Sequence, residues 1–359
     1  MNRSKTPIIG ITLGDVNGVG PEVIIKTLMD QRITEFCIPV VYASPKIFSF
    51  YKKLLGYNEF NLFIAKGVDQ LNAKRPNVLV CWEEEIEIKP GEVTDIAGKY
   101  ALRSLELATA DLKEGKIDGL LTAPLNKHNI PAAGSGEKFI GHTEYLAHAL
   151  SAPEHLMFLL SSELKMGLAT GHLPIKEVAG KLSVEKIVSK LRVMKKSLFS
   201  DFGISKPRIA LLGLNPHAGD NGLLGTEDKD IIAKAAEVAQ NENIYAFGPY
   251  PADGFFGSRQ YKSFDAVMAM YHDQGLIPFK HLAFEEGVNY TAGLAAVRTS
   301  PDHGTGYSLA GKNQASEISF RNALYAAVDI IRHRHNSDEI TANPLPFTPL
   351  RRERFRIDF

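Results

Sequence analysis

The segment DAVMAMYHDQG, which occupies residues 265–275, decides the expected fold. Its first part, 265–270, is a short apolar run of the kind that forms a strand buried in a parallel sheet. His272 stands directly beyond that run, followed by the polar residues Asp273 and Gln274. We therefore expect a buried strand that places a histidine at the carboxyl end of a sheet.

Two other segments repeat this arrangement. The apolar run 165–170 leads to His172, and the run 208–214 leads to His217. The carboxyl ends of parallel strands lie at one edge of a sheet, where ligands bind in open α/β folds. Neutral imidazole is a common ligand of divalent metals, and three such groups leave coordination positions for a substrate. A single histidine of this kind is more often a hydrogen-bonded loop residue, but three in equivalent positions favour a metal site.

Short apolar runs alternate with longer amphipathic stretches along the chain, which predicts an α/β protein with a mostly parallel sheet. The clearest helix is expected over 94–114, with Thr94 as its N-cap and Gly115 as its stop. Further helices are expected over 184–198 and 227–240. The remaining expected strands cover residues 7–13, 38–43, 77–81, 118–123 and 156–161.

Composition limits the class of protein. The chain has 359 residues, which is enough for two lobes with a cleft between them. Lys and Arg number 41, as do Asp and Glu, and this balance argues against nucleic acid as a partner. No apolar run approaches the roughly 20 residues that cross a bilayer, so no membrane partner is expected. The first residues lack the apolar core of a signal peptide, and we expect a cytoplasmic protein.

The two cysteines and the C-terminal end receive structural interpretations. Cys37 and Cys81 each lie beside an apolar run and are expected to be buried thiols. After Arg334 the chain becomes polar and then proline-rich from Pro344, which predicts an irregular tail. A weaker interpretation of its basic residues 351–356 is an arm that binds an anion or a partner.

Several polar residues outside the three histidines are candidates for anion binding. His142 and Thr143 stand at the start of a predicted helix, 143–150, where Thr143 can cap the helix or the pair can hold a phosphate or carboxylate. Lys280 and Arg298 lie on either side of a polar stretch and suit a substrate with two anionic ends. Taken singly, each of these two cations is more often a surface charge.

Two glycine-rich segments remain, GDVNGVGPE at 14–22 and DHGTGYSLAG at 302–311. Neither is a P-loop or a GxGxxG fingerprint. The first predicts a tight strand-to-helix turn with a helix starting at Pro21. The second either lets the backbone approach a flat or phosphorylated ligand or is a flexible surface loop.

Over about residues 7–330 the chain resembles the 4-hydroxythreonine-4-phosphate dehydrogenase family of pyridoxal phosphate biosynthesis. The most specific matching block is 269–275. The other matching blocks are 14–22, 141–144, 172–174, 214–219, 251–253, 265–280, 287–289 and 298–311.

The resemblance implies a two-lobed α/β/α fold similar to isocitrate and isopropylmalate dehydrogenases, with the site in a cleft between the lobes. Residues 1–135 and 298–335 would form the first lobe. Residues 136–297 would form the second lobe, which carries the metal histidines and the dimer contacts, and 336–359 would be a C-terminal extension. The resemblance also implies a homodimer that shares each metal site between its subunits.

The implied activity is NAD(P)-dependent oxidation of the C3 hydroxyl of 4-phosphooxy-L-threonine to 2-amino-3-oxo-4-phosphooxybutanoate. Decarboxylation to 3-amino-2-oxopropyl phosphate follows. NAD or NADP and one divalent metal per site (Zn, Mg or Co) are the implied cofactors. The alternatives are a related dehydrogenase of a phosphorylated threonate or a cyclic diol and, less strongly, a metal-dependent phosphatase or a non-catalytic binding protein.

The resemblance assigns roles to particular residues. The metal ligands would be His172, His217 and His272, and the substrate contacts His142, Thr143, Lys280, Asn289 and Arg298. The nucleotide-binding residues would be His303, Gly304, Thr305 and Gly311. Lys280, Asp253 and Asp273 are the candidates for catalysis. Ser308 replaces an aspartate that is common in the family, which leaves NAD against NADP open.

Overall fold

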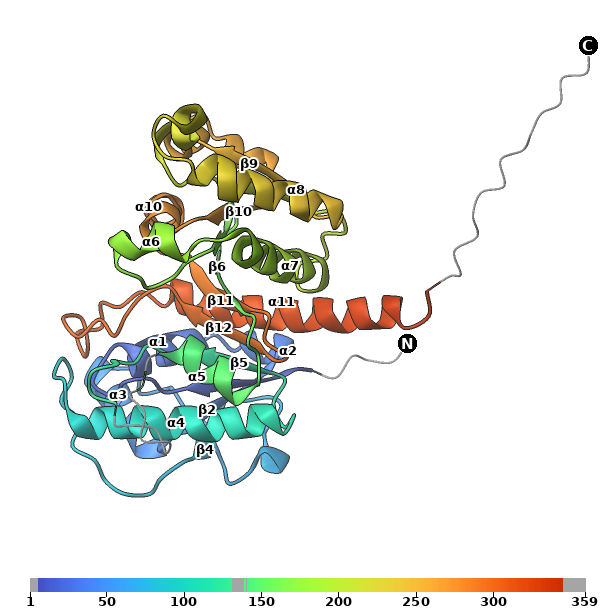
Figure 1. Ribbon diagram of the computed structural model, residues 1–359. Coiled ribbons are helices and arrows are strands. Elements are labelled where there is room, and N and C mark those ends of the chain that lie inside the picture. Colours follow the sequence, from blue (N-terminus) through green and yellow to red (C-terminus); the bar gives the residue numbers. More distant parts are fainter. Residues whose placement is uncertain (1–5, 131–138, 140, 345–359) are drawn as a thin grey trace, which may run out of the picture.

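The computed structural model describes residues 6–130, 139 and 141–344. In this part of the chain, twelve strands form one continuous sheet, in the order β3-β4-β2-β1-β5-β12-β11-β6-β7-β10-β8-β9 (Figure 1). Helices are interspersed between the strands along the chain, so the predicted α/β class is confirmed.

The first six strands of that order are all parallel to one another, and we call them the first half-sheet. They are β3 (Phe63–Ala65), β4 (Asn77–Val80), β2 (Ile38–Ala43), β1 (Ile8–Thr12), β5 (Gly119–Thr122) and β12 (Val297–Pro301). β12 belongs to the last third of the chain, yet it pairs with β5, so the C-terminal region completes this half-sheet.

The other six strands form the second half-sheet, which lies above the first in Figure 1. They are β11 (Val288–Ala292), β6 (Leu156–Leu160), β7 (Lys165–Leu168), β10 (Ala266–Ala269), β8 (Arg208–Leu212) and β9 (Tyr245–Tyr250). β11 is antiparallel to both β12 and β6, and β6 is antiparallel to β7. The sheet is therefore mostly parallel, as predicted, with its antiparallel pairs where the two halves join.

All eight expected strands form, each within two residues of its predicted ends. Four further strands, β3, β9, β11 and β12, were not predicted. β11 and β12 carry Asn289 and Arg298 inside them, and β9 contains Gly248 and Pro249. A search for unbroken apolar runs passes over such strands, because their polar side chains are buried through tertiary contacts.

The expected helices also form, with one irregularity. α4 (Asp95–Lys113) starts at Thr94, whose hydroxyl accepts a hydrogen bond from the Ala97 N–H, and it ends before Gly115, which has a φ of +69°. α7 covers Val184–Ser200. The helix expected over 227–240 begins as a π-helical turn, η3 (Asp228–Ala233), and continues as α8 (Lys234–Asn241).

The other helices are shorter, and several of them open the segments that follow strands. They are α1 (Gly20–Leu28), α2 (Ile33–Phe36), α3 (Pro45–Leu55), η1 (Val68–Gln70), α5 (His142–Ala149), α6 (Ile175–Lys181), η2 (Pro216–Gly222), α9 (Ala252–Gly257), η4 (Gln260–Ser263) and α10 (His272–Ala283).

The last helix, α11 (Ile318–Thr341), corrects the expectation of an irregular tail after Arg334. The helix continues past that residue because Arg334 is anchored: its guanidinium donates to Asp201 and to the carbonyls of Leu294 and Ala295. The prolines beyond Pro344 and the basic residues 351–356 lie outside the described residues.

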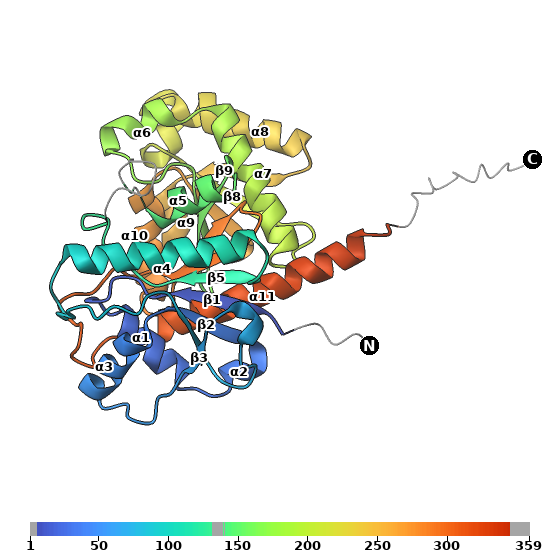
Figure 2. The same cartoon turned by 90° about the horizontal axis from the view of Figure 1, so that it is seen from below.

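Helices cover both faces of the first half-sheet. α4 packs against β1, β2 and β5, and α11 packs against β12, β5 and β11, so the strands lie between two layers of helices (Figure 2). This double covering explains why strand residues such as Ile9, Ile11 and Val40 are completely buried. Cys37 and Cys81 are buried and unpaired, as expected. No helix in the described ranges has the length and apolar character of a membrane span.

Candidate functional site

Three neighbouring strands place the three predicted metal histidines at one edge of the sheet. β10 lies between β7 and β8 and is parallel to both, so the loops after their carboxyl ends leave on the same side. His172 follows β7 and His272 follows β10, and their imidazole rings lie 5.3 Å apart between centroids. The structure thus brings together two side chains that are 100 positions apart in the sequence.

The environment of this pair suits metal binding. Burial lowers the pKa of His172, and the nearby charges of Lys127 and His272 lower it further, so the ring is neutral at neutral pH. His272 Nδ1 lies 2.7 Å from a carboxylate oxygen of Asp273, which leaves Nε2 as the nitrogen available to a ligand. Neutral imidazoles held in this way are typical ligands of divalent metals.

His217 stands apart from this pair. It begins a left-handed turn in η2, where His217, Ala218, Asp220 and Asn221 all have positive φ values between 42° and 56°. Such residues are strained, and strain of this kind is concentrated at functional sites. Within the ranges that the structure describes, no group of three or more His, Cys, Asp and Glu side chains is arranged to hold a metal. A ligand set completed by a second subunit, as implied by the resemblance, stays a prediction.

Asp228, which the sequence analysis missed, holds the strained loop. It is 1% exposed, and its carboxylate accepts hydrogen bonds from the N–H groups of Leu214 and Asn215 and from the Asn215 side chain, at 2.7 to 3.1 Å. In the sequence it looks like an ordinary acidic residue in the first turn of a helix. Its burial is visible only in the folded chain.

Arg298 is the most unusual charge in the protein, because it is 2% exposed and its guanidinium contacts hydroxyl groups. It donates to Thr122 at 2.7 and 3.1 Å and to Thr291 at 3.1 Å, and Thr143 lies 3.5 Å away. No carboxylate forms an ion pair with it among the residues described. Burial lowers its pKa to about 10, so the group still carries its charge at neutral pH. A buried cation with neutral partners is prepared for an anionic ligand.

His142 and Asn289 supply unpaired polar atoms in the predicted substrate set. His142 Nε2 and Asn289 Oδ1 are both buried without a hydrogen-bond partner in the described part of the chain. Burial, together with the charges of Arg298 and Lys127, holds the pKa of His142 well below its ordinary value. Unpaired buried polar groups are costly, and a bound polar ligand would satisfy them.

Thr143 does not cap the helix, so that part of the expectation is wrong. Gly141 is the N-cap residue of α5, and no side chain caps the helix. The Thr143 hydroxyl instead lies toward Arg298.

Lys280 and the segment after β12 form a second polar group. Lys280 Nζ lies 3.7 Å from a carboxylate oxygen of Asp302. His303 Nδ1 contacts the Gly304 carbonyl oxygen at 3.0 Å, whereas its Nε2 is buried and unpaired in the described structure. Burial lowers the pKa of His303, which therefore stays neutral. A Cβ built on Gly304 would meet no atom within 4 Å, so backbone is open to a ligand there.

Charges connect these groups into one region. Lys127 lowers the pKa of both His142 and His172. Burial raises the pKa of Asp302, and Lys280, His303 and His272 oppose that rise, so His272 lies near the second group as well. These charge interactions place in one region the predicted site residues His142, His172, His272, Lys280, Arg298 and His303.

Two predicted site residues have other surroundings. Asp253 is exposed in the short helix α9, and no hydrogen bond or ion pair in the described structure links it to the converging residues. Gly311 has a φ of +74°, and a Cβ there would lie 3.0 Å from Pro90, so this glycine serves packing.

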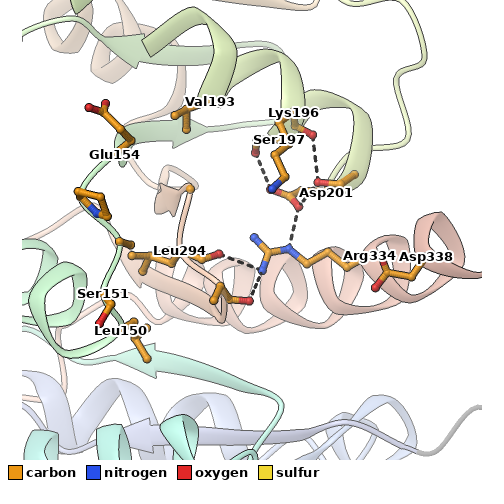
Figure 3. Close-up of a pocket in the computed structure, with 15 residues that line it drawn as sticks. Leu150, Ser151, Glu154, Val193, Lys196, Ser197, Asp201, Leu294, Arg334 and Asp338 are labelled. Atoms are coloured by element: carbon orange, nitrogen blue, oxygen red, sulfur yellow. Dashed lines mark hydrogen bonds and ion pairs between the residues drawn. The ribbon is translucent and has the colours of Figure 1, made fainter. Parts of the chain in front are cut away.

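The pocket drawn in Figure 3 is separate from this region. It has a volume of about 580 Å³, and its walls come from α7, α11, the turn after β11 and the segment 150–154 between α5 and β6. None of the predicted site residues lines it. Its main feature is the ion pair between Asp201 and Arg334, which joins α7 to α11.

Comparison with known proteins places the chain in a family. The family model "Pyridoxal phosphate biosynthetic protein PdxA" matches residues 35–327. A protein of Bacteroides thetaiotaomicron named 4-hydroxythreonine-4-phosphate dehydrogenase is 46% identical over 338 residues, which cover 94% of this chain and 92% of that protein. A protein of Oceanobacillus iheyensis named putative D-threonate 4-phosphate dehydrogenase is 39% identical over 332 residues, covering 91% of this chain and 98% of that protein.

Solved structures agree. A crystal structure of 4-hydroxythreonine-4-phosphate dehydrogenase from Klebsiella pneumoniae aligns with a TM-score of 0.76 and 34% identity, covering 90% of this chain and 99% of that one. Isocitrate dehydrogenase from Methylococcus capsulatus aligns with a TM-score of 0.50 at 13% identity, over 93% of this chain and 88% of that one. This second likeness concerns the fold alone and confirms the expected architecture. The chain belongs to the family of the pyridoxal phosphate biosynthetic protein PdxA.

Proposed function

We propose that the protein oxidises the C3 hydroxyl of 4-phosphooxy-L-threonine with NAD(P) as the hydride acceptor. The observation that carries the proposal is the buried Arg298 cation, which has threonine hydroxyls as partners and whose charge acts on the unpaired imidazole of His142. Asn289, with its own unpaired side-chain oxygen, lies on β11, the strand that also carries the Arg298 partner Thr291. A substrate with a phosphate and a carboxylate supplies the anionic and polar groups that this region lacks.

The chemistry is balanced in two steps. Hydride leaves C3 for the nicotinamide and the hydroxyl proton is released, which gives 2-amino-3-oxo-4-phosphooxybutanoate. This β-keto acid loses carbon dioxide and takes up a proton to give 3-amino-2-oxopropyl phosphate. Lys280 and Asp302 lie at the junction of the half-sheets, and we assign to Lys280 a contact with the reacting end of the substrate. Asp273 orients His272.

The residues present suit the two expected cofactors. His172 and His272 would hold a divalent cation, together with His217 or a ligand from a second subunit. When bound, such a cation lowers the pKa of the substrate hydroxyl and stabilises the negative charge that develops during decarboxylation. His303, Gly304 and Thr305 would contact the nucleotide, because this segment offers open backbone and an unpaired imidazole nitrogen.

We also infer the larger organisation. The lobes would comprise residues 1–135 with 298–335, and 136–297, since the junction between β11 and β12 separates the two half-sheets. Residues 336–359 would be an extension, of which α11 includes the first part. We propose a homodimer that shares its metal sites, acting in the cytoplasm, and mass measurement in solution tests the dimer directly.

A second candidate is oxidation of D-threonate 4-phosphate, which one relative at 39% identity is named for. Both substrates carry a phosphate and a carboxylate, so Arg298 favours neither. They differ at C2, which bears an amino group in one and a hydroxyl group in the other.

The test is turnover by the full-length protein after chelation and reloading with Zn²⁺, Mg²⁺ or Co²⁺. Each phosphorylated substrate is offered with NAD and with NADP, and reduced nicotinamide and carbon dioxide are both measured. We expect reduced nicotinamide and carbon dioxide in equal amounts from 4-phosphooxy-L-threonine, and no turnover of the unphosphorylated 4-hydroxy-L-threonine. Release of inorganic phosphate without reduced nicotinamide would overturn the proposal in favour of a phosphatase. A preference for D-threonate 4-phosphate would establish the second candidate.

A further inference from the structure

Two loops that are almost 300 residues apart in the chain are in direct backbone contact. The turn after β1 and the segment after β12 meet where the Val19 N–H donates to the Thr305 carbonyl oxygen at 2.9 Å. A Cβ on Gly18 would lie 2.7 Å from the same oxygen. Gly306 has a φ of +55°, and a Cβ there would lie 2.9 Å from the Val19 side chain. Both glycines are therefore needed for the loops to approach this closely.

The buried carboxylate of Asp15 stabilises the contact between the two loops. Asp15 is completely buried, and its Oδ1 accepts a hydrogen bond from the Asn17 N–H at 2.9 Å. Its Oδ2 accepts two more, from the Asn129 side-chain amide at 2.9 Å and from the Tyr307 hydroxyl at 2.8 Å. Three donors offset the cost of removing a carboxylate from water, and one of them comes from the segment after β12.

Tyr307 is suited to a permanent donor role. Burial raises the pKa of its phenol well above the ordinary value, and the hydrogen bond to Asp15 raises it further, so the hydroxyl stays protonated. Tyr307 lies near the middle of segment 302–311. The residues proposed to meet the nucleotide, His303, Gly304 and Thr305, precede Tyr307 by two to four positions, and Gly304 has open space around it.

The turn after β1 is also held by hydrogen bonds to residues 89–94. The Asn17 side chain donates to the Glu92 carbonyl oxygen and to the Thr94 hydroxyl, both at 3.1 Å, and accepts from the Lys89 N–H at 2.8 Å. Asp15 therefore sits on a rigid support that continues into the N-terminus of α4. The Tyr307 hydroxyl cannot move away from this support without breaking its partly buried hydrogen bond to Asp15.

We propose that Asp15 is a positioning residue for the nucleotide: through the Tyr307 hydroxyl it holds segment 302–311 in the conformation that binds NAD(P). The inference rests on the proposed function, since it concerns the same nucleotide. Holding the segment in its binding conformation before the ligand arrives lowers the entropic cost of binding. Loss of the Tyr307 hydroxyl should therefore weaken nucleotide binding and leave substrate binding unchanged.

The test compares Tyr307→Phe and Asp15→Asn with a matched control, Tyr42→Phe. Tyr42 also donates a hydrogen bond to an aspartate, at a distance of 2.8 Å. That aspartate is Asp111, which belongs to α4 and lies away from segment 302–311. Dissociation constants for NADH and NADPH are measured by the fluorescence of the reduced nicotinamide. KM values for each substrate and the melting temperature of each variant are measured as well.

We expect Tyr307→Phe to raise the dissociation constant and the nucleotide KM about tenfold, which corresponds to about 1.4 kcal/mol. The KM for the phosphorylated substrate should stay within about twofold, and the melting temperature should match that of Tyr42→Phe. The double variant of Asp15 and Tyr307 should bind nucleotide no more weakly than whichever single variant binds it less tightly, because both changes act on the nucleotide through the hydrogen bond between these two residues.

The outcomes separate the two claims. Wild-type protein that binds neither nucleotide overturns the proposed function and this inference together. Wild-type protein that binds nucleotide while Tyr307→Phe binds as tightly as Tyr42→Phe overturns only the inference. Equal losses for nucleotide and phosphorylated substrate would also overturn it, because they would indicate general damage to the fold.

Discussion

Lys280 and Asp302 form an ion pair across the junction of the two half-sheets, with Nζ 3.7 Å from the carboxylate. Lys280 belongs to α10, which follows β10 in the second half-sheet, and Asp302 follows β12 in the first. The pair therefore lies where a substrate bound between the halves would contact both. Burial raises the pKa of Asp302, and the charge of Lys280 opposes that rise.

Lys280→Met is expected to reduce kcat by about 10²-fold, the usual effect of losing a group that assists proton transfer. The measurement is steady-state turnover at saturating nucleotide. Lys262→Met is the matched control, because Lys262 forms a half-exposed pair with Glu163 on the surface. Equal kcat values for the two variants would remove Lys280 from the chemistry.

Arg298→Met is expected to weaken substrate binding without lowering the stability of the unliganded protein. Methionine removes a buried charge that has neutral partners, so the melting temperature without ligand should stay the same or rise. The KM for the phosphorylated substrate should rise about 10²-fold, because a charge-assisted hydrogen bond contributes about 1.5–3 kcal/mol. Thermal melts with and without substrate provide the check. A large loss of stability in the unliganded variant would mean that Arg298 is structural.

The pair of Asp201 and Arg334 is expected to stabilise the protein strongly. Asp201 is 1% exposed and also accepts hydrogen bonds from Ser197 and Tyr290. Burial pushes the pKa of Asp201 up, but the Arg334 guanidinium and the hydroxyl donors outweigh it, and the net pKa is lowered. Arg334→Met leaves this carboxylate buried without its cation, which costs about 3–5 kcal/mol of unfolding free energy.

Urea denaturation measures that loss, with Arg192→Met as the control. Arg192 pairs with Glu242 on the surface, where a pair contributes about 0–1 kcal/mol. If Arg334→Met unfolded at the same urea concentration as Arg192→Met, the pair drawn in Figure 3 would not be what joins α11 to α7.

Because of His142, we expect the free energy of unfolding to decrease as the pH falls below neutrality. Its pKa in the folded protein lies well below the ordinary value of 6.5, through burial and the charges of Arg298 and Lys127. The folded state then binds fewer protons than the unfolded state below about pH 6.5. The contribution of His142 is therefore complete above that pH and is lost as the pH falls, by up to about 1.4 kcal/mol per pH unit.

Unfolding free energies between pH 5 and 8 test this point. His142→Asn should flatten the slope below pH 6.5. His335→Asn, which changes an exposed histidine of α11, should leave the slope as it is. The same slope in all three proteins would show that His142 is not buried as a neutral ring.

The local pattern of the sequence was sufficient for much of the fold. Eight strands, the capped helix α4 and the burial of both cysteines followed from runs of apolar residues and from capping residues. It also placed His172 and His272 beyond neighbouring strands. This worked because periodicity and strand ends are properties of a few adjacent residues. Three of the four missed strands, β9, β11 and β12, lie where that pattern is interrupted by buried polar residues or by Gly and Pro, and the fourth, β3, has only three residues.

The resemblance to a family named the residues of the site, but their environments could not be predicted from it. Arg298 could be a surface charge from its position in the sequence, whereas the fold buries it among threonines from β5 and β11. Asp228 looked like a routine first-turn acid, yet it holds the strained loop of His217. Segment 302–311 was compatible with a flexible loop until Asp15 and Tyr307 were seen in contact.

The sequence by itself thus determined the α/β class, eight of the twelve strands, the main helices and the family to which the chain belongs. The tertiary structure alone decided which strands are neighbours and how far α11 extends, to Thr341. It also decided which polar groups are removed from solvent. The physical reason is that helix and strand preferences are set by residues close together in the chain. Desolvation and charge interactions depend on side chains that come together only when segments more than 100 residues apart pack against each other.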